Sequence, residues 1–285
     1  MFRFLPPLPL MHSKVSLPFL LLAFLIPPGQ MHGQFFWPWR KEAVVNLRPD
    51  EAKKIGERIW RNECDGTVEG LTSWNRGENF ASLGIGHFIW YPVGVDGPFD
   101  ESWPKLLNFL RSREVNVPSW LLQERNCPWH NYEEFQAARE GPEMRDLRTL
   151  LSRTVAQQTE FIIQRLRSAL PKIMGSSAVP RSSRKLVETR FEALAGTSQG
   201  LYAMADYVNF KGEGTKSEER YHGHGWGLAQ VLMEMRGYPR GPMAAWEFSE
   251  AAKRVLLRRV QNAPKDESQW LDGWQNRCDT YKAPL

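Results

Sequence analysis

Two glutamates flank a turn-rich segment early in the chain, and their spacing suggests acid chemistry. Glu63 follows Ile55 and Ile59 at helical spacing, so the apolar stripe of a helix ends in a carboxylic acid. Burial and the negative end of a helix dipole both raise the pKa of such a group, as a general acid requires near neutral pH. Glu78 follows fifteen residues later. Two carboxylates on opposite walls of a cleft are the minimum set for cleaving a glycosidic bond.

The second chemical feature is the run Ser82-Leu83-Gly84-Ile85-Gly86-His87. Glycine inside a strand marks a bulge, a bend or a close approach to the backbone. We expect a polysaccharide to lie against this backbone. We expect Ser82 to help hold a water, and His87 to hydrogen-bond the helix that bears Glu63. Asn75, in Ser-Trp-Asn-Arg-Gly-Glu, can bind a sugar amide or a water, although Asn-x-Gly is also ordinary turn chemistry.

A helix that ends in Glu, followed by a hairpin with Ser-x-Gly-Ile-Gly-His, resembles the catalytic segment of phage-type lysozymes. Those enzymes cut the glycan of peptidoglycan. The resemblance covers about 35 residues and implies a lysozyme-like fold with Glu63 as general acid. Where the family carries an Asp this chain has Arg76, and Ser82 replaces the family's Thr. Glu78 is the nearest carboxylate and our choice for the second one, with Asp65 or Glu69 next.

A second polar and aromatic stretch lies at 205–232, with five glycines between positions 212 and 227. Such a composition, on a loop between helices, is typical of a ligand site. We expect this loop to form the opposite wall of the cleft, with Tyr221 or Trp226 stacking on a sugar ring. The Gly-rich segment leading to Gln230 is loosely similar to segments that line the sugar cleft of lysozyme-superfamily enzymes. A structural turn with buried Tyr and Trp is the alternative. The candidate binding residues in this stretch are Tyr207, Asn209, Lys211, Glu213, Tyr221, Trp226 and Gln230.

Two other chemistries use residues of the same regions. His222 and His224 with Glu218 or Glu219 would offer zinc ligands, but no His-Glu-x-x-His motif or Cys pair supports a metal site. Cys64 with His87 as base would make a cell-wall peptidase. A helix C-terminus raises the pKa of a thiol, which argues against it. We expect no metal and no cofactor.

The elements that must position these residues are mostly helices. Period and capping predict helices over 49–62, 103–110, 144–170, 184–195 and 227–236, and a further one beginning at 268–274. Pro171 is expected to close the long helix, and Ser249 to cap a helix through Val260. Residues 67–92 carry turn and β-type residues, which predict a small hairpin or sheet. The fold class is therefore α+β and mostly helical, with a small early sheet and a larger helical lobe.

The N-terminus carries an export signal by composition. Arg3 and Lys14 are basic, and 16–26 is an apolar run too short to span a membrane. We expect residues 1–33 to be a signal peptide, 34–46 a linker, and 47–285 one domain of two parts, 47–99 and 100–285. A retained N-terminal anchor is the alternative. With the signal peptide cleaved, we expect the protein to be periplasmic or secreted, and monomeric. We expect no stable insertion in a membrane after cleavage.

Charge and cysteine content narrow the partners. The chain has 37 Lys and Arg against 32 Asp and Glu, and two of the basic residues fall in 1–33. The small remaining excess, without a basic block, argues against nucleic acid and suits an anionic polymer such as cell wall. Twelve tryptophans offer platforms for sugar rings. Three cysteines, Cys64, Cys127 and Cys278, allow one disulfide, whose pairing stays open.

Two functions are compatible with these sequence features. The first is a glycoside hydrolase that cleaves glycan strands of peptidoglycan, a chitin-like glycan being the other polymer in question. The second is a catalytically inactive glycan-binding or envelope protein on the same scaffold. An enzyme predicts a second carboxylate facing Glu63 across an open cleft, roughly 5–10 Å away. A binding protein tolerates Glu63 in an occluded ion pair.

Overall fold

Eleven helices and two small sheets make up the part of the chain that the computed structural model describes, residues 48–97, 99–217 and 219–285. The prediction of a mostly helical α+β fold is confirmed. The signal peptide and linker predicted for 1–46 lie outside the described residues. Within the described ranges, no helix is long and apolar enough to cross a membrane. These described residues form one compact unit.

The first segment consists of one helix and a three-stranded sheet. Helix α1 (Pro49–Cys64) begins with Pro49, Asp50 and Glu51, which suit the first turn of a helix. It buries Ile55 and Ile59 and packs against α6 (Val155–Gly175). A short 3-10 turn, η1 (Glu69–Leu71), leads into the antiparallel order β1 (Thr72–Ser73), β2 (Ala81–Leu83) and β3 (Phe88–Trp90).

Helices follow the sheet. They are α2 (Trp103–Ser112), α3 (Ser119–Gln123), α4 (Tyr132–Ala137), α5 (Pro142–Arg153) and then α6. The expected single helix over 144–170 is two helices, because Thr154 leaves the helical conformation and its hydroxyl bonds the Leu150 carbonyl at 2.7 Å. Pro171 does not close α6. The helix continues to Gly175 because Ala169 and Ile173, on either side of the proline, are fully buried in the core.

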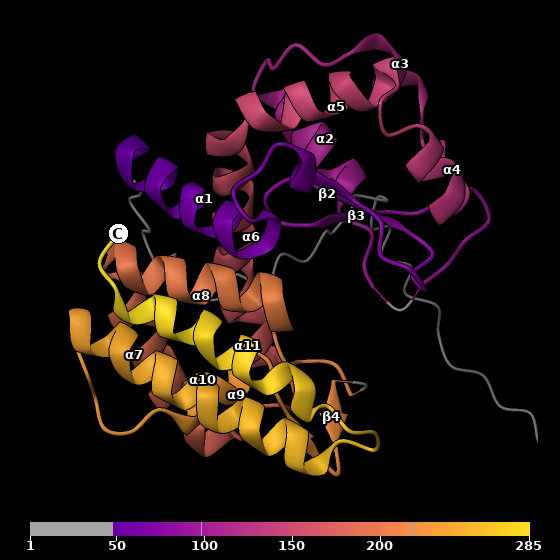
Figure 1. The fold of residues 1–285 in the computed structure, drawn as a ribbon. Coiled ribbons are helices and arrows are strands. Elements are labelled where there is room, and N and C mark those ends of the chain that lie inside the picture. Colours follow the sequence, from indigo (N-terminus) through magenta and orange to yellow (C-terminus); the bar gives the residue numbers. More distant parts are fainter. Residues whose placement is uncertain (1–47, 98, 218) are drawn as a thin grey trace, which may run out of the picture. The chain divides into compact units, whose positions relative to one another are not determined.

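Five C-terminal helices pack on one another, and the first two of them also pack on α6 (Figure 1). They are α7 (Arg184–Ala195), α8 (Ser198–Lys211), α9 (Leu228–Glu234), α10 (Pro242–Asn262) and α11 (Ser268–Asp279), with the hairpin β4 (Arg220–Tyr221) and β5 (His224–Gly225) and the 3-10 turns η2 (Arg181–Ser183) and η3 (Thr280–Lys282). Helix α7 has its predicted bounds. Ser249 is no N-cap, because α10 begins at Pro242 and the buried Ser249 hydroxyl donates to the Cys278 carbonyl at 2.7 Å.

Helix α6 connects the two parts of the fold. It contacts α1 and α2 on the side of the sheet, and α7 and α8 among the C-terminal helices. One hydrophobic core runs through both parts, from Ile55 in α1 and Leu83 in β2 to Phe248 in α10. This continuity allows residues far apart in the sequence to meet at the end of α1.

Candidate functional site around Glu63

Glu63 lies in the last turn of α1, and its side chain is 11% exposed. Three side chains from distant segments converge on its carboxylate. Oε1 accepts a hydrogen bond from Asn209 Nδ2 of α8 at 2.9 Å, and another from the Arg277 guanidinium of α11. Oε2 lies 3.4 Å from Nδ1 of His87, which follows the glycine turn of the sheet. The site therefore forms where α1, the sheet and the C-terminal helices meet.

The charge state of Glu63 corrects the sequence prediction. Burial raises the pKa of this carboxyl, but the charges of Arg277 and His87 and the Asn209 hydrogen bond outweigh burial and hold the pKa below its usual value. The predicted raised pKa is therefore wrong for the free protein, where Glu63 is an ionised carboxylate. The physical reason is Arg277, which lies 214 residues further along the chain.

Arg277 is itself held by a second carboxylate. Its Nε donates to Asp206 Oδ2 at 2.8 Å and a terminal nitrogen donates to Oδ1 at 2.9 Å, a two-pronged pairing. Asp206 is fully buried and also accepts from Tyr281 at 2.6 Å and from Asn62 at 3.1 Å. Burial opposes the charge on Arg277, but Asp206 and Glu63 raise its pKa well above the usual value. Both carboxylate oxygens of Asp206 therefore accept hydrogen bonds from strong donors. Glu63 has strong donors on Oε1 but not on Oε2.

His87 connects the glycine turn to the end of α1. Its backbone adopts the left-handed conformation, with φ of 46°, and its Nε2 lies 3.7 Å from Cys64 Sγ while Nδ1 faces Glu63. Burial raises the pKa of the Cys64 thiol to about 12, so this sulfur stays protonated and is a poor nucleophile despite the nearby imidazole. Cys64, Cys127 and Cys278 are all buried free thiols.

The two glycines of the turn are approached by protein side chains. Gly84 has φ of +69°, and a Cβ there would lie 2.3 Å from Gln158 Oε1 of α6. That oxygen accepts from the Ile85 N–H at 2.9 Å. A Cβ on Gly86 would lie 2.8 Å from the Phe88 ring of β3 and 3.2 Å from Asn209 Oδ1. The expectation that a polysaccharide lies against this backbone is therefore corrected: the glycines make room for the Phe88 ring and for side chains of α6 and α8.

The structure does not bring Glu78 to Glu63. Strand pairing places the turn 84–87 at one end of the sheet and the loop 74–80 at the other. With three-residue strands the two ends are separated by about 10 Å, and no hydrogen bond or shared pocket joins the two carboxylates among the described residues. Glu78 instead lines a pocket of about 400 Å³ together with Trp74, Arg76 and Tyr132. Among the described residues, no contact and no pocket brings Glu63 and Glu78 together as a facing pair.

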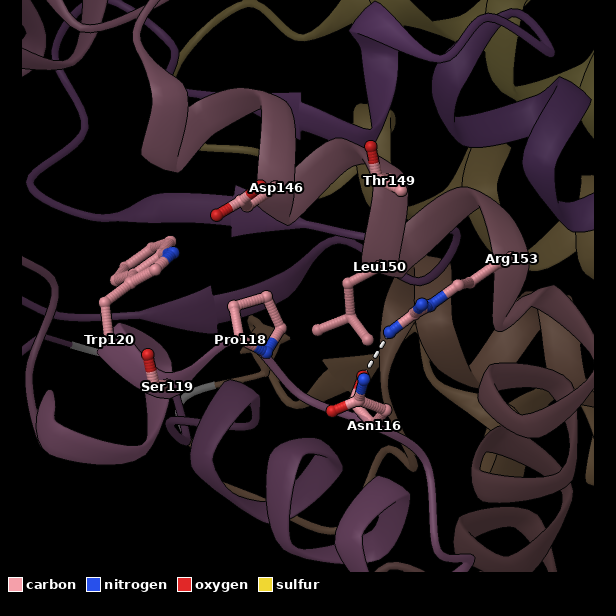
Figure 2. A pocket seen from close by; sticks show the side chains of 8 residues that line it. All are labelled: Asn116, Pro118, Ser119, Trp120, Asp146, Thr149, Leu150 and Arg153. Carbon is pink, nitrogen blue, oxygen red and sulfur yellow. Dashed lines mark hydrogen bonds between the residues drawn. The ribbon is translucent and has the colours of Figure 1, made fainter.

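The other early candidates lie along the sheet. Ser82 is buried in β2, opposite Ser73 and Ile89. Asn75 is exposed in the loop, where its carbonyl accepts from the Glu78 N–H at 3.1 Å. A second pocket of about 330 Å³, lined in part by Trp120, Asp146 and Arg153, lies between α3 and α5 (Figure 2). Neither pocket includes Glu63.

The second stretch is helical over its first part, because α8 continues to Lys211 and only Gly212 ends it. Tyr207 is fully buried and donates to the Trp226 carbonyl at 2.7 Å, and Gln230 bonds the backbone of Gly214 and Gly227. Both side chains therefore hold the loop together and do not face a ligand. Glu213 pairs with Lys172 at 2.7 Å.

Two aromatic candidates of this stretch pack against each other with tilted rings. The rings of Tyr221 and Trp226 lie 4.5 Å apart between centroids, and the Tyr221 hydroxyl donates to Glu267 at 3.0 Å. Trp226 is buried. His222 and His224 are exposed, and no group of three or more His, Cys, Asp or Glu side chains able to hold a metal occurs among the described residues.

Sequence reasoning missed Arg277, Trp274 and Arg259. All three lie in the C-terminal helices, beyond the stretch that stands out by composition. Trp270, Trp274 and Arg277 follow at helical spacing in α11. That pattern, a row of large side chains on one helix face, was the available signal.

Comparison of the chain with family models, with curated proteins and with solved structures gave no match. The resemblance to phage-type lysozymes therefore depends on the residues around Glu63 and the glycine turn.

Proposed function

We propose that this protein is a glycan-cleaving enzyme of the lysozyme-like kind, acting on peptidoglycan, with Glu63 as its proton-transfer group. The observation that supports the proposal is the convergence of His87, Asn209 and Arg277 on one nearly buried carboxylate. Such a cluster is expensive to desolvate, and hydrophobic residues would fill the same space at no loss of stability. Clusters of this kind are typical of functional sites.

The order of elements fits the same proposal. A helix ends in the glutamate, a short antiparallel sheet with a Gly-Ile-Gly-His turn follows, and helices complete the fold. His87 Nδ1 lies 3.4 Å from Oε2, while Arg277 and Asn209 hold Oε1. Oε2 is therefore the oxygen that would carry and transfer the proton.

The absence of a partner carboxylate at Glu63, within the described ranges, favours chemistry with one acid. Asp206 is buried and saturated, and Glu78 lies at the other end of the sheet. In the proposed reaction, protonated Glu63 donates to the leaving glycosidic oxygen. The resulting carboxylate then takes a proton from the attacking hydroxyl. A hydroxyl of the same sugar needs no second carboxylate to position it, so intramolecular transfer is favoured over attack by water.

The test is release of soluble fragments from purified peptidoglycan and from chitin by the wild type, Glu63→Gln and Glu78→Gln. The amide of Glu63→Gln keeps the shape of the side chain and removes the transferable proton. We expect a loss of at least a hundredfold in Glu63→Gln and near wild-type release by Glu78→Gln, since general acid catalysis supplies about 10²–10⁴-fold. Intramolecular transfer gives fragments one water lighter than hydrolysis. Unchanged release by Glu63→Gln contradicts the proposal.

A second candidate is a glycan-binding protein without catalysis. The specific observation that favours it is the ion pair between Glu63 and Arg277, which holds Glu63 ionised in the free protein. This candidate predicts no fragment release by either protein, together with retention of both the wild type and Glu63→Gln on insoluble peptidoglycan.

The proposal also includes export to the periplasm or the outside of the cell, which the composition of residues 1–33 supports. N-terminal sequencing of the protein recovered from that compartment tests it. Recovery of the intact N-terminus would favour a retained anchor.

A further inference from the structure

Aromatic rings and basic side chains alternate over the surface next to Glu63. The row runs through Trp226, Arg259, Trp274, Lys211, Phe210 and Arg277 and is called here the cation–aromatic row. Its members come from the β5 end, α10, α11 and α8, and all except the buried Trp226 are partly exposed. Arg277, the last member, is the residue that binds Glu63. The row is therefore continuous with the candidate active site.

Lys211 stands out among the three cations because it has no carboxylate partner among the described residues. Arg259 is bound to Glu267 through two hydrogen bonds of 2.7 and 2.9 Å, and Arg277 is bound to Asp206 and Glu63. The ammonium of Lys211 lies on two rings instead, 3.5 Å from the Trp274 centroid and 4.0 Å from that of Phe210.

The environment of Lys211 favours an incoming anion. Burial lowers the pKa of this amine to about 6, and the neighbouring charges of Arg259 and Arg277 act in the same direction. Glu267 opposes them, but its carboxylate is already engaged by Arg259. The ring faces attract the ammonium, yet a cation–π contact does not neutralise its charge. A ligand carboxylate would supply the missing negative charge, and the rings beside it offer flat faces on which a sugar can stack.

We propose that Lys211, seated on Trp274 and Phe210, binds a carboxylate of the glycan and makes the protein select acidic glycans over neutral ones. The inference rests on the proposed function for its link to cleavage, whereas binding itself needs no catalysis. It separates the two polymers in question, because peptidoglycan carries carboxylates on its stem peptides and on lactyl groups that have lost their peptide, whereas chitin is uncharged.

The experiment measures binding by calorimetry in the Glu63→Gln background, which prevents turnover. The two ligands are a peptidoglycan tetrasaccharide with lactyl carboxylates and no peptide, and chitotetraose as the neutral ligand of equal length. Lys211→Met keeps the length of the side chain and removes the amine that a bound carboxylate would hold protonated. Lys185→Met on α7, an exposed lysine paired with Glu188, is the matched control. We expect Lys211→Met to weaken binding of the acidic ligand at least tenfold and to leave chitotetraose binding and the control unchanged.

A second readout keeps the proposal testable if Lys211→Met folds poorly. In the otherwise intact Glu63→Gln protein, titration of the Lys211 ¹³Cε resonance reports the pKa of the amine directly. The acidic tetrasaccharide should raise that pKa and chitotetraose should not. Equal loss of both ligands in Lys211→Met, no loss of either, or an unchanged pKa overturns the proposal. If Lys211 selects the acidic ligand but nothing is cleaved, the inference stands and the enzyme proposal fails. If Lys211→Met cleaves both polymers normally, the enzyme proposal stands and the inference about Lys211 fails.

Discussion

At the residue scale, Arg277 determines the charge state of the Glu63 carboxyl group. Each of two carboxylates, one fully buried and one nearly so, depends on this guanidinium for its charge balance. Arg277→Met keeps much of the apolar stem but leaves Asp206 without a cation and Glu63 with His87 alone. Because removing one partner of a buried ion pair strands the other charge, we expect a loss of about 3–5 kcal/mol in the free energy of unfolding.

Urea unfolding at pH 7 measures this loss. Arg61→Met, on the exposed side of α1, is the control and should shift stability by no more than about 0.5 kcal/mol. A loss below about 1 kcal/mol in Arg277→Met would mean that the network contributes little and that Glu63 is held by other contacts.

Glu63 also sets the expected pH dependence of activity. A general acid must be protonated, and Arg277, His87 and Asn209 hold the pKa of Glu63 below 4.5 in the free protein. The protonated fraction therefore rises as the pH falls, and kcat/KM should increase toward acidic pH and reach its plateau only below about pH 4.5. Fragment release between pH 3.5 and 8 measures the profile. A maximum near pH 7 would mean that another group supplies the proton.

Lys211 carries a stability consequence of the opposite sign to that of an ion pair. Its folded pKa of about 6 lies below the usual 10.5, so the unfolded chain binds more protons between those values and stability rises with pH there. Below pH 6 both states are protonated and the full cost of burying the charge is present. Lys211→Met should therefore raise Tm most at pH 5–6, and the gain should vanish near pH 10.5. Thermal unfolding across this range, beside Lys185→Met, measures it; a constant difference would show that the amine is not perturbed.

At the element scale, the glycine turn is a packing device. Alanine at Gly84 meets two obstacles, a φ of +69° and the Gln158 amide oxygen at 2.3 Å. Gly77 has φ of +88°, and a Cβ added there would have nothing within 4 Å, so alanine at this position meets only the backbone obstacle. A strained φ costs about 1–3 kcal/mol. Gly84→Ala should therefore exceed Gly77→Ala in its loss of stability.

The difference between the two alanine variants, measured by urea unfolding, gives the contribution of Gln158 packing. Combining Gly84→Ala with Gln158→Ala should recover part of it, because the clash is removed. Equal losses of stability in the Gly84 and Gly77 variants would show that α6 shifts to accommodate the added methyl group at no energetic cost.

The elements also show where sequence patterns suffice. Helix α7 and the early sheet follow from local period and turn residues, and both were predicted. The break at Thr154, the passage of α6 through Pro171 and the interior position of Ser249 were not. In each case a tertiary contact decides: Ile173 in the core keeps α6 helical, and the Cys278 carbonyl takes the Ser249 hydroxyl.

The residues of the candidate site likewise fall into those that local sequence patterns identify and those that only tertiary contacts reveal. Glu63 and His87 were found because they lie within 25 residues of each other in a local motif. Asn209 was chosen because of the polar and aromatic composition of the stretch around it. Its hydrogen bond to Glu63 joins residues that are 146 positions apart in the sequence. Arg277 was missed, and with it the sign of the Glu63 pKa shift, because no local pattern reports the distance between α1 and α11. Burial alone, read from an apolar stripe, predicts the wrong direction when an unseen cation is present.

At the scale of the whole molecule, the site joins the two parts of the fold. Glu63 and His87 belong to the part with the sheet, whereas Asn209 and Arg277 belong to the C-terminal helices, and α6 packs against both. The hydrophobic core is continuous across them. We therefore expect residues 48–285 to unfold as one cooperative unit, although their length would allow two.

Native-state hydrogen exchange measures this cooperativity. The slowest amides of α1 and of α10 should exchange with the same free energy, and Arg277→Met should lower both by the same amount, because the network contributes to the single global transition. Exchange of α10 at a free energy well above that of α1 would show two foldons. The site would then lie at a boundary between two parts that unfold separately. In the locally unfolded state, Glu63 would lose its contacts with Arg277 and Asn209. Its pKa would return toward the usual value there, which would supply the protonated acid at a higher pH than the closed structure allows.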